Sequence, residues 1–143
     1  MHPCVLKRLR LSAPEFFLFR GELQMHDYPL TYKHPKDIEL RRLVGKPLFS
    51  MGRLVATPGA LELLTTAQCH PIRLLQRHQC GDWSDSDGLC SADKAANDQA
   101  LLSGGRLLSL YLVDGIRLYV ITEAVNDVTS QRDSTCILLP SEY

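Results

Sequence analysis

Residues 106–123 read RLLSLYLVDGIRLYVITE, and this stretch decides the fold. Two runs of eight residues, rich in aliphatic, aromatic and β-branched side chains, flank Asp114-Gly115. This pair is the one that best suits a two-residue type I′ turn. The sequence therefore predicts an antiparallel hairpin, and its register places Arg106 opposite Glu123, where the two charges can pair across the strands.

Both faces of this hairpin are apolar. Alternation along the strands places on one face Leu107, Ser109, Tyr111, Val113, Ile116, Leu118 and Val120. It places on the other face Leu108, Leu110, Leu112, Tyr119 and Ile121. An antiparallel sheet with one face in water would instead alternate apolar and polar residues. We therefore expect that helices cover both faces, or that a second protein chain covers one of them.

Short helices are predicted before the hairpin. Thr57 is placed to be an N-cap and Pro58 the first helical residue, where no backbone N–H is needed. A proline also begins a second helix over residues 71–78. A third helix is expected to start from Ser91 as N-cap and to stop at the glycines of 104–105.

The remaining elements complete the expected fold. A short strand is predicted over 53–56, a turn-rich loop over 81–88, and a third antiparallel strand over 135–139, ended by Pro140. The fold class is therefore α+β: a three-stranded antiparallel β-meander packed with two or three short helices, plus an irregular N-terminal arm.

Charge divides the chain into two parts. Residues 1–46 contain nine Lys and Arg against five Asp and Glu, a net charge of +4, and residues 47–143 therefore carry −4. The first part has prolines and histidines with no sustained hydrophobic period, and at most one helix, over 37–44. We expect a basic N-terminal arm over 1–46 and one compact α+β domain over 47–143.

Composition excludes several classes of protein. The chain has 143 residues, zero formal net charge, 45% hydrophobic residues and 22% charged residues, which is typical of a soluble domain. A broad basic face for duplex nucleic acid is not expected, because such binding depends on neutralising phosphates. Five cysteines without a signal-peptide pattern favour reduced thiols and a cytoplasmic location. Every apolar run is too short to span a bilayer.

No metal site is predicted. Five potential zinc ligands fall within 22 residues, but they are adjacent or one residue apart rather than in the usual spaced pairs. These residues are Cys69, His70, His78, Cys80 and Cys90. The acidic run Asp82, Asp85, Asp87, Gly88 fails as a calcium loop, because its frame puts Trp83 at position one and Lys94 at position twelve.

Catalytic motifs are also missing from the sequence. The chain has no GxSxG, GxxxxGK[ST], GxGxxG or HExxH pattern, and no feature marks one thiol as activated. We therefore expect no catalytic residues, no cofactor and no enzymatic activity.

Residues 47–143 resemble a family of small plasmid-related proteins carried by bacterial plasmids and integrative elements. The segments that carry the resemblance are PLFSMGRLVATPGAL at 47–61, Arg77-His78, Gly81-Asp82-Trp83, AND at 96–98 with AL at 100–101, 104–109, VITEA at 120–124 and ILLPSEY at 137–143. Two parts depart from the family pattern: 125–134 is longer, and 1–46 has no counterpart. Some members are labelled as type I restriction–modification subunits, but this chain has neither a methyl-donor glycine motif nor an NPP[FY] motif.

The resemblance implies that the chain serves a mobile element, and such accessory proteins often disarm host defence. We therefore expect a non-catalytic anti-defence protein, of anti-CRISPR or anti-restriction type, that binds a subunit of a defence nucleoprotein complex. The expected contact residues lie on the hairpin and in the acidic loop: Asp82, Trp83, Asp85, Asp87, Leu110, Leu112, Arg117, Tyr119 and Glu123. Homodimerisation through the second sheet face, and a nucleic-acid-binding regulatory or maintenance protein that uses the basic arm, remain as alternatives.

Overall fold

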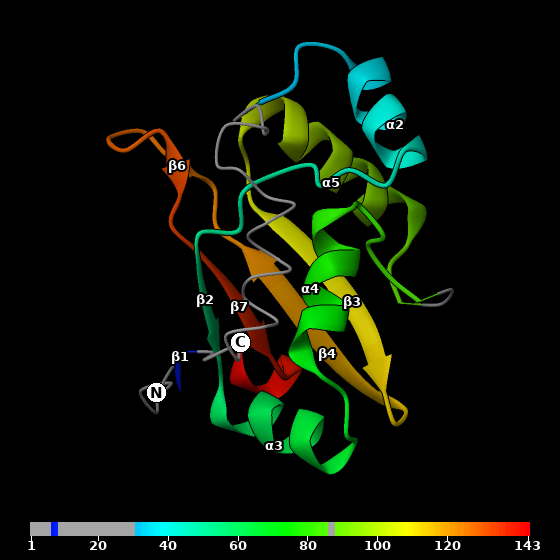
Figure 1. Cartoon of the computed structure of the whole chain (residues 1–143), viewed down its shortest axis with the longest axis vertical. Helices are drawn as coiled ribbons and strands as arrows, with labels where there is room; N and C mark the ends of the chain where they lie inside the picture. Colours follow the sequence, from blue (N-terminus) through cyan, green and yellow to red (C-terminus); the bar gives the residue numbers. More distant parts are fainter. Residues whose placement is uncertain (1–6, 9–30, 86–87) are drawn as a thin grey trace.

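A mixed five-stranded sheet organises the molecule (Figure 1). The computed structural model describes residues 7–8, 31–85 and 88–143. Within them the strand order is β1-β2-β7-β4-β3, and all neighbours are antiparallel except β2 and β7, which are parallel. The bounds are β1 Lys7–Arg8, β2 Arg53–Ala56, β3 Leu107–Val113, β4 Ile116–Thr122 and β7 Ser134–Leu138. A separate two-stranded hairpin, β5 (Val125–Asn126) with β6 (Gln131–Arg132), lies between β4 and β7 in the chain.

The α+β class is confirmed, but the three-stranded antiparallel meander is not. Strands β3, β4 and β7 are antiparallel neighbours as expected. The sheet continues beyond them, because β2 adds to β7 in parallel, with Val55 opposite Cys136. A strand of four residues carries too little pattern to reveal its partner, so its pairing with β7 could not be read from local sequence.

The predicted hairpin is present with the predicted register. Asp114 and Gly115 have φ values of 49° and 73°, the positive values that a type I′ turn requires. The Nη2 atom of Arg106 lies 3.3 Å from Oε2 of Glu123, so the predicted cross-strand ion pair also forms.

Four helices accompany the sheet in the described residues: α2 (Pro35–Leu43), α3 (Pro58–Thr66), α4 (Pro71–Gln79) and α5 (Ser91–Ser103). The Thr57 hydroxyl caps α3 as predicted, by accepting a hydrogen bond from the Ala60 N–H. Ser91 is the first residue of α5 rather than its N-cap, which is Cys90. A 3-10 turn, η1 (Pro140–Glu142), follows β7. None of the described helices has the length and apolar character needed to cross a membrane.

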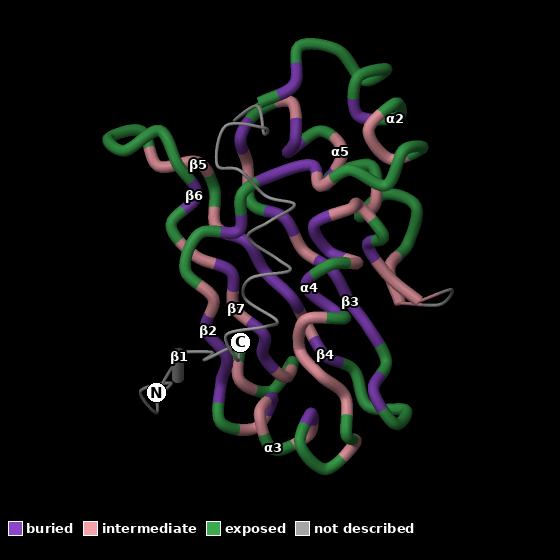
Figure 2. Tube along the Cα trace, viewed as in Figure 1, coloured by how far each residue is buried: buried purple, intermediate pink, exposed green. Residues whose placement is uncertain are grey.

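One core joins all four helices to one face of the sheet (Figure 2). Each helix contributes at least one buried residue, for example Ile38 from α2 and Leu75 from α4, and the sheet contributes Tyr111 and Val120. Part of the predicted arm belongs to this core, because Tyr32 is buried and its hydroxyl donates to the Leu48 carbonyl at 2.7 Å. Residues 1–6 and 9–30 of the arm lie outside the described residues.

The second face of the sheet, on the side of Leu108 and Tyr119, is also largely buried. Four of its side chains are at most 7% exposed and lie outside the helix-side core cluster: Val55, Leu110, Ile121 and Leu138. Leu112, near the hairpin turn, is 46% exposed. A single chain therefore buries most of this face, and only part of it remains open.

His78 of α4 ties the helical layer to three strands. Its Nδ1 lies 2.6 Å from Ser109 Oγ on β3, and its Nε2 lies 2.8 Å from Thr122 Oγ1 on β4. Thr122 Oγ1 lies 2.7 Å from Thr135 Oγ1 on β7, and Thr135 donates to the Met51 carbonyl. Since each hydroxyl has one proton, Thr135 must accept from Thr122, and Thr122 must accept from His78. The chain of hydrogen bonds therefore assigns the proton of the neutral imidazole to Nε2.

Burial, with a smaller contribution from Arg132, lowers the pKa of His78 to about 3. The unfolded chain binds a proton on this imidazole below about pH 6.5, while the folded chain does not. Stability should therefore fall as the pH drops from 6.5 toward 3, by about 1.4 kcal/mol per pH unit from this group. Urea titrations at pH 6 and pH 5 measure this change in the free energy of unfolding with pH.

The matched variant is His78→Gln, which keeps an amide donor and acceptor but does not titrate. Its free energy of unfolding should be lower at pH 7 and should change less between pH 6 and pH 5 than that of the natural chain. Equal slopes for the two proteins would contradict a neutral buried His78.

Candidate functional site

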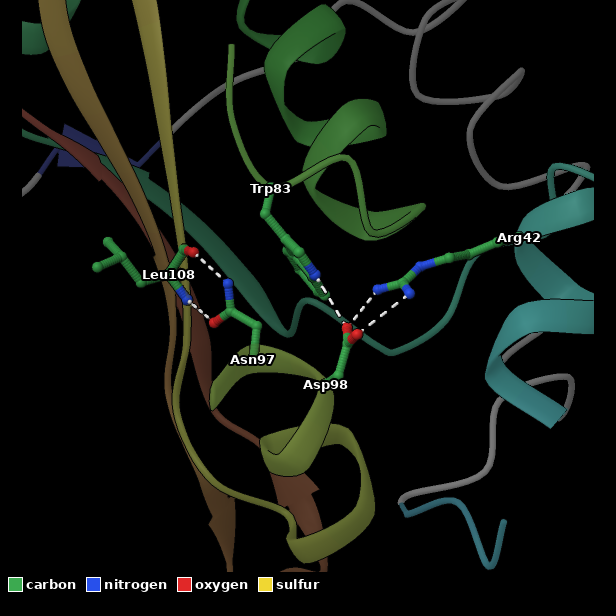
Figure 3. Close-up of polar contacts among 5 residues, drawn as sticks. All are labelled: Arg42, Trp83, Asn97, Asp98 and Leu108. Atoms are coloured by element: carbon green, nitrogen blue, oxygen red, sulfur yellow. Dashed lines mark hydrogen bonds and ion pairs between the residues drawn. The ribbon is translucent and has the colours of Figure 1, made fainter. Parts of the chain in front are cut away.

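Backbone groups along the outer edge of β3 form hydrogen bonds with α5 and with the loop after α4. Asn97 of α5 accepts from the Leu108 N–H at 2.9 Å and donates to the Leu108 carbonyl at 2.7 Å (Figure 3). Further along, the Leu110 N–H donates to the Trp83 carbonyl, and the Leu112 N–H donates to the Asp85 carboxylate. Because these edge groups are paired within the chain, this edge is not an open template for strand addition.

Trp83 is a buried anchor rather than an exposed contact residue. Its side chain is 4% exposed and stacks on Phe49. Its indole N–H donates to Asp98, which also pairs with Arg42 from α2 (Figure 3). Gly81, with φ +79°, leaves room for this guanidinium, because a Cβ there would lie 2.5 Å from Arg42 Nε. Figure 3 shows that the contacts of Arg42, Trp83 and Asp98 connect α2, α5 and the loop after α4.

The acidic loop is paired internally. The guanidinium of Arg77 lies 2.6 Å from Asp82 and 3.0 Å from Asp85, and it also stacks over the Tyr111 ring at 4.4 Å. The hydrogen bonds that Arg77 donates to Asp82 and Asp85 raise the pKa of Arg77, against the opposing effect of burial. Asp87, the other predicted contact residue of this loop, lies outside the described residues.

Four predicted contact residues lie on the open part of the second sheet face: Leu112, Arg117, Tyr119 and Glu123. Leu112 and Arg117 are cross-strand partners, and both are exposed. Leu110 shares this face but is 3% exposed, so it contributes to the interior of the chain. The structure therefore separates the predicted residues into a buried or internally paired loop and an exposed sheet surface.

Two further residues complete this surface. The Tyr143 ring meets the Tyr119 ring edge-on, with centroids 6.4 Å apart, and its hydroxyl accepts from Arg106 Nη1 at 2.9 Å. Arg106 in turn pairs with Glu123, and each of their side chains is about half exposed. We call Arg106, Tyr119, Glu123 and Tyr143 the tyrosine patch. Tyr143 was not predicted as a contact residue, because no local signal in the sequence indicates where the C-terminus folds.

Glu142 determines where Tyr143 lies. Its carboxylate accepts hydrogen bonds from the Thr57 hydroxyl, from the Gly59 N–H at 2.9 Å and from the Leu139 N–H at 2.9 Å. Burial opposes ionisation, but these hydrogen bonds outweigh it and lower the pKa of Glu142 below its usual value. The C-terminus is thereby fixed to the start of α3, and Tyr143, 75% exposed, is held beside β4.

The candidate metal ligands do not converge. Among residues 7–8, 31–85 and 88–143, no three His, Cys, Asp or Glu side chains lie close enough to hold a metal ion. His70 accepts a hydrogen bond at the start of α4, and the Cys90 thiol donates to Asp93. Cys69 and His70 line an open hollow of about 290 Å³ between α3 and α4. Burial raises the pKa of the Cys80 thiol, which makes it a poorer nucleophile.

Comparisons of this chain with protein-family models, with curated proteins and with solved structures found no match.

Replacing Asn97 should remove its two hydrogen bonds to the outer edge of β3 and lower the stability of the protein. Asn97 is 4% exposed, so Asn97→Ala leaves the Leu108 N–H and carbonyl without their partner and should cost about 1–3 kcal/mol of unfolding free energy. Chemical denaturation measures the loss. Gln99→Ala, at an exposed position on the same helix, is the control and should change stability by less than about 0.5 kcal/mol. Similar losses for the two variants would contradict the role of Asn97.

Removing the Glu142 carboxylate should release the C-terminus. Glu142→Ala is expected to lower the unfolding free energy by about 1–3 kcal/mol and to detach the Tyr143 ring from Tyr119, because three donors lose their acceptor. Since the folded pKa is below the unfolded one, this stabilisation is present above about pH 4.5 and is lost as the pH falls further.

Chemical denaturation and the NMR signals of the Tyr143 ring measure both effects. Glu62→Ala, an exposed carboxylate on α3, is the control. An unchanged Tyr143 environment in Glu142→Ala would contradict the anchoring.

Proposed function

We propose that this chain is a non-catalytic protein-binding factor that contacts its partner through the tyrosine patch and the neighbouring Leu112 and Arg117. The observation that carries the proposal is the placement of two tyrosines and two arginines on the open part of an otherwise buried, apolar sheet face. This combination of side chains is characteristic of the energetic centres of protein interfaces.

The patch is suited to binding because its side chains are already held in place. Arg106 is fixed by Tyr143 on one side and by Glu123 on the other, and Tyr119 is fixed by the Tyr143 ring. Tyrosine offers a large contact area with few rotatable bonds, and preorganised side chains lose less conformational entropy on binding. The flanking Leu112 adds an exposed apolar side chain beside Arg117.

The described part of the basic arm offers little support for nucleic-acid binding. Arg41 donates to the Pro47 carbonyl through Nε and Nη2, and Arg42 is paired with Asp98 beneath Trp83. These guanidinium groups organise the chain itself. Binding to a nucleic-acid backbone requires Lys or Arg side chains that neutralise phosphates and so displace the counterions condensed on the nucleic acid. Arginines that are already paired within the chain are less available for this.

The target that we propose is a subunit of a host defence complex, and the protein is accordingly an anti-defence factor of a mobile element. The support for this choice is the resemblance of residues 47–143 to plasmid-related proteins. Binding by occlusion suits the mixed character of the tyrosine patch, which has one arginine, one glutamate and two tyrosines, with Arg117 beside it, rather than a phosphate-like row of carboxylates.

The test is capture of purified complexes by the tagged chain. A CRISPR surveillance complex and a type I restriction complex are each offered to the natural chain and to Tyr143→Asp and Tyr119→Asp. We expect one complex to be retained and its DNA cleavage inhibited by the natural chain. Either variant should weaken binding by at least about tenfold, as expected for an interface centre.

The control is Leu43→Lys, which changes an exposed apolar residue on α2. It should bind as the natural chain does when the tagged protein is immobilised at low density. Retention of neither complex would contradict the anti-defence proposal, and equal binding by the tyrosine variants would contradict the tyrosine patch as the contact surface.

A further inference from the structure

The second face of the sheet has a charge opposite to that of the domain around it. Residues 47–143 carry −4 overall, with seven Lys and Arg against eleven Asp and Glu. Strand register and alternation nevertheless place three of the seven cations on this face, Arg53, Arg106 and Arg117. Among the described strand residues of the face, Glu123 is the one carboxylate. The face is therefore locally basic within an acidic domain.

The three arginines surround the tyrosine patch instead of forming a row. Arg53 of β2, through Ser134 of β7, lies in one line across the sheet with the pair of Glu123 and Arg106 (Figure 1). Since neighbouring strands are about 4.8 Å apart, the backbones of Arg53 and Arg106 are about 14 Å apart. Arg117 lies about 20 Å from Arg106, because its cross-strand partner is six residues further along β3. A standard interface of about 800 Å² per partner is wide enough to cover all three.

Two of these arginines have no ionic partner within the chain. Arg53 and Arg117 are exposed, and neither forms an ion pair with any carboxylate of residues 7–8, 31–85 and 88–143. The third, Arg106, donates to the Tyr143 hydroxyl at 2.9 Å, and its contact with Glu123 is longer, at 3.3 Å, and half exposed. Positive charge on this face is therefore available to a binding partner.

An acidic protein surface complements this arrangement better than nucleic acid does. The potentials of two surfaces in a specific interface are complementary, and a guanidinium pairs well with a carboxylate. A strand of B-DNA carries one charge about every 3.4 Å along its axis, whereas these arginines are about 14–20 Å apart. Glu123, which lies between Arg53 and Arg106, would also repel a phosphate backbone.

We propose that the partner of this face is an acidic protein surface, whose carboxylates meet Arg53, Arg106 and Arg117. The apolar centre of that surface meets Tyr119 and Tyr143. This inference rests on the proposed function, in which the same face contacts the target. It also specifies where on a defence complex the chain binds. Surfaces that hold nucleic acid are basic and repel a basic face, so the chain covers an acidic protein-docking surface and leaves the nucleic-acid channel open.

An NMR titration with short probes tests the partner chemistry without a defence complex. The probes are an acidic peptide of about eight residues that contains Glu and Leu, the same peptide with Lys in place of every Glu, and single-stranded DNA of similar length. An extended peptide of this size spans about 26 Å, enough to reach from Arg106 to Arg117. The acidic peptide should shift the ring signals of Tyr119 and Tyr143, and should bind at least about tenfold more tightly than either other probe.

Charge reversal locates the binding of the acidic peptide. Arg53→Glu and Arg117→Glu should each weaken it at least about fivefold, and the difference should disappear at about 1 M salt, where the Debye length is about 3 Å. Arg73→Glu is the matched control, because it makes the same change at an exposed arginine of α4, a helix that packs on the other side of the sheet. It should bind as the natural chain does. Circular dichroism first confirms that each variant is folded.

A complex retained in the capture experiment tests the place of binding. The chain should bind that complex equally well before and after the complex is loaded with its nucleic acid. Loss of binding on loading would place the chain in the nucleic-acid channel and overturn the proposal.

The peptide results also separate this proposal from the proposed function. Equal binding of the two peptides, or binding of neither, would overturn the acidic partner, and tighter binding of the DNA would assign the face to nucleic acid. A complex captured through the tyrosines but insensitive to Arg53→Glu and Arg117→Glu would leave the proposed function standing without an acidic partner. Preference for the acidic peptide with neither complex captured would contradict the anti-defence target alone.

Discussion

The structure depends most on a buried imidazole. His78 is fully enclosed, yet it links α4 to β3 and β4 directly and to β7 and the Met51 carbonyl through two threonine hydroxyls. Each hydroxyl in this series of hydrogen bonds has one proton to donate. The direction of every bond therefore follows from the final acceptor, the Met51 carbonyl, which can only accept. Only the neutral imidazole satisfies the network, since a second ring proton would leave the Ser109 hydroxyl without its acceptor.

This network explains why His78 is a structural rather than a reactive residue. A general base needs an available lone pair and a pKa near the working pH, whereas His78 uses both ring nitrogens and has a pKa lowered to about 3. Phe49 and Trp83 pack around the ring and exclude water from it. The same residues hold the loop after α4, so the polar network and the aromatic cluster stabilise one another.

Local sequence patterns predicted the local structure well. The Asp114-Gly115 turn, the hairpin register, the Arg106–Glu123 pair and the proline-initiated helices all depend on residues close together in the chain, where steric and hydrogen-bonding rules act directly. The parallel pairing of β2 with β7 joins residues about 80 apart, and no periodicity within four residues specifies such a partner.

The candidate site also combines residues that local sequence rules could place with residues that only long-range contacts bring together. Tyr119 and Glu123 could be placed on one face because strand alternation is a local rule. Tyr143 joins them only because Glu142 bonds to Thr57 and Gly59, more than 80 residues away. The sequence predicts a turn-rich loop over 81–88, and Trp83 and Asp85 are predicted there as contact residues. That composition does not reveal that a loop folds back on a sheet edge, where its polar groups pair with Asp98, Arg77 and the Leu112 N–H.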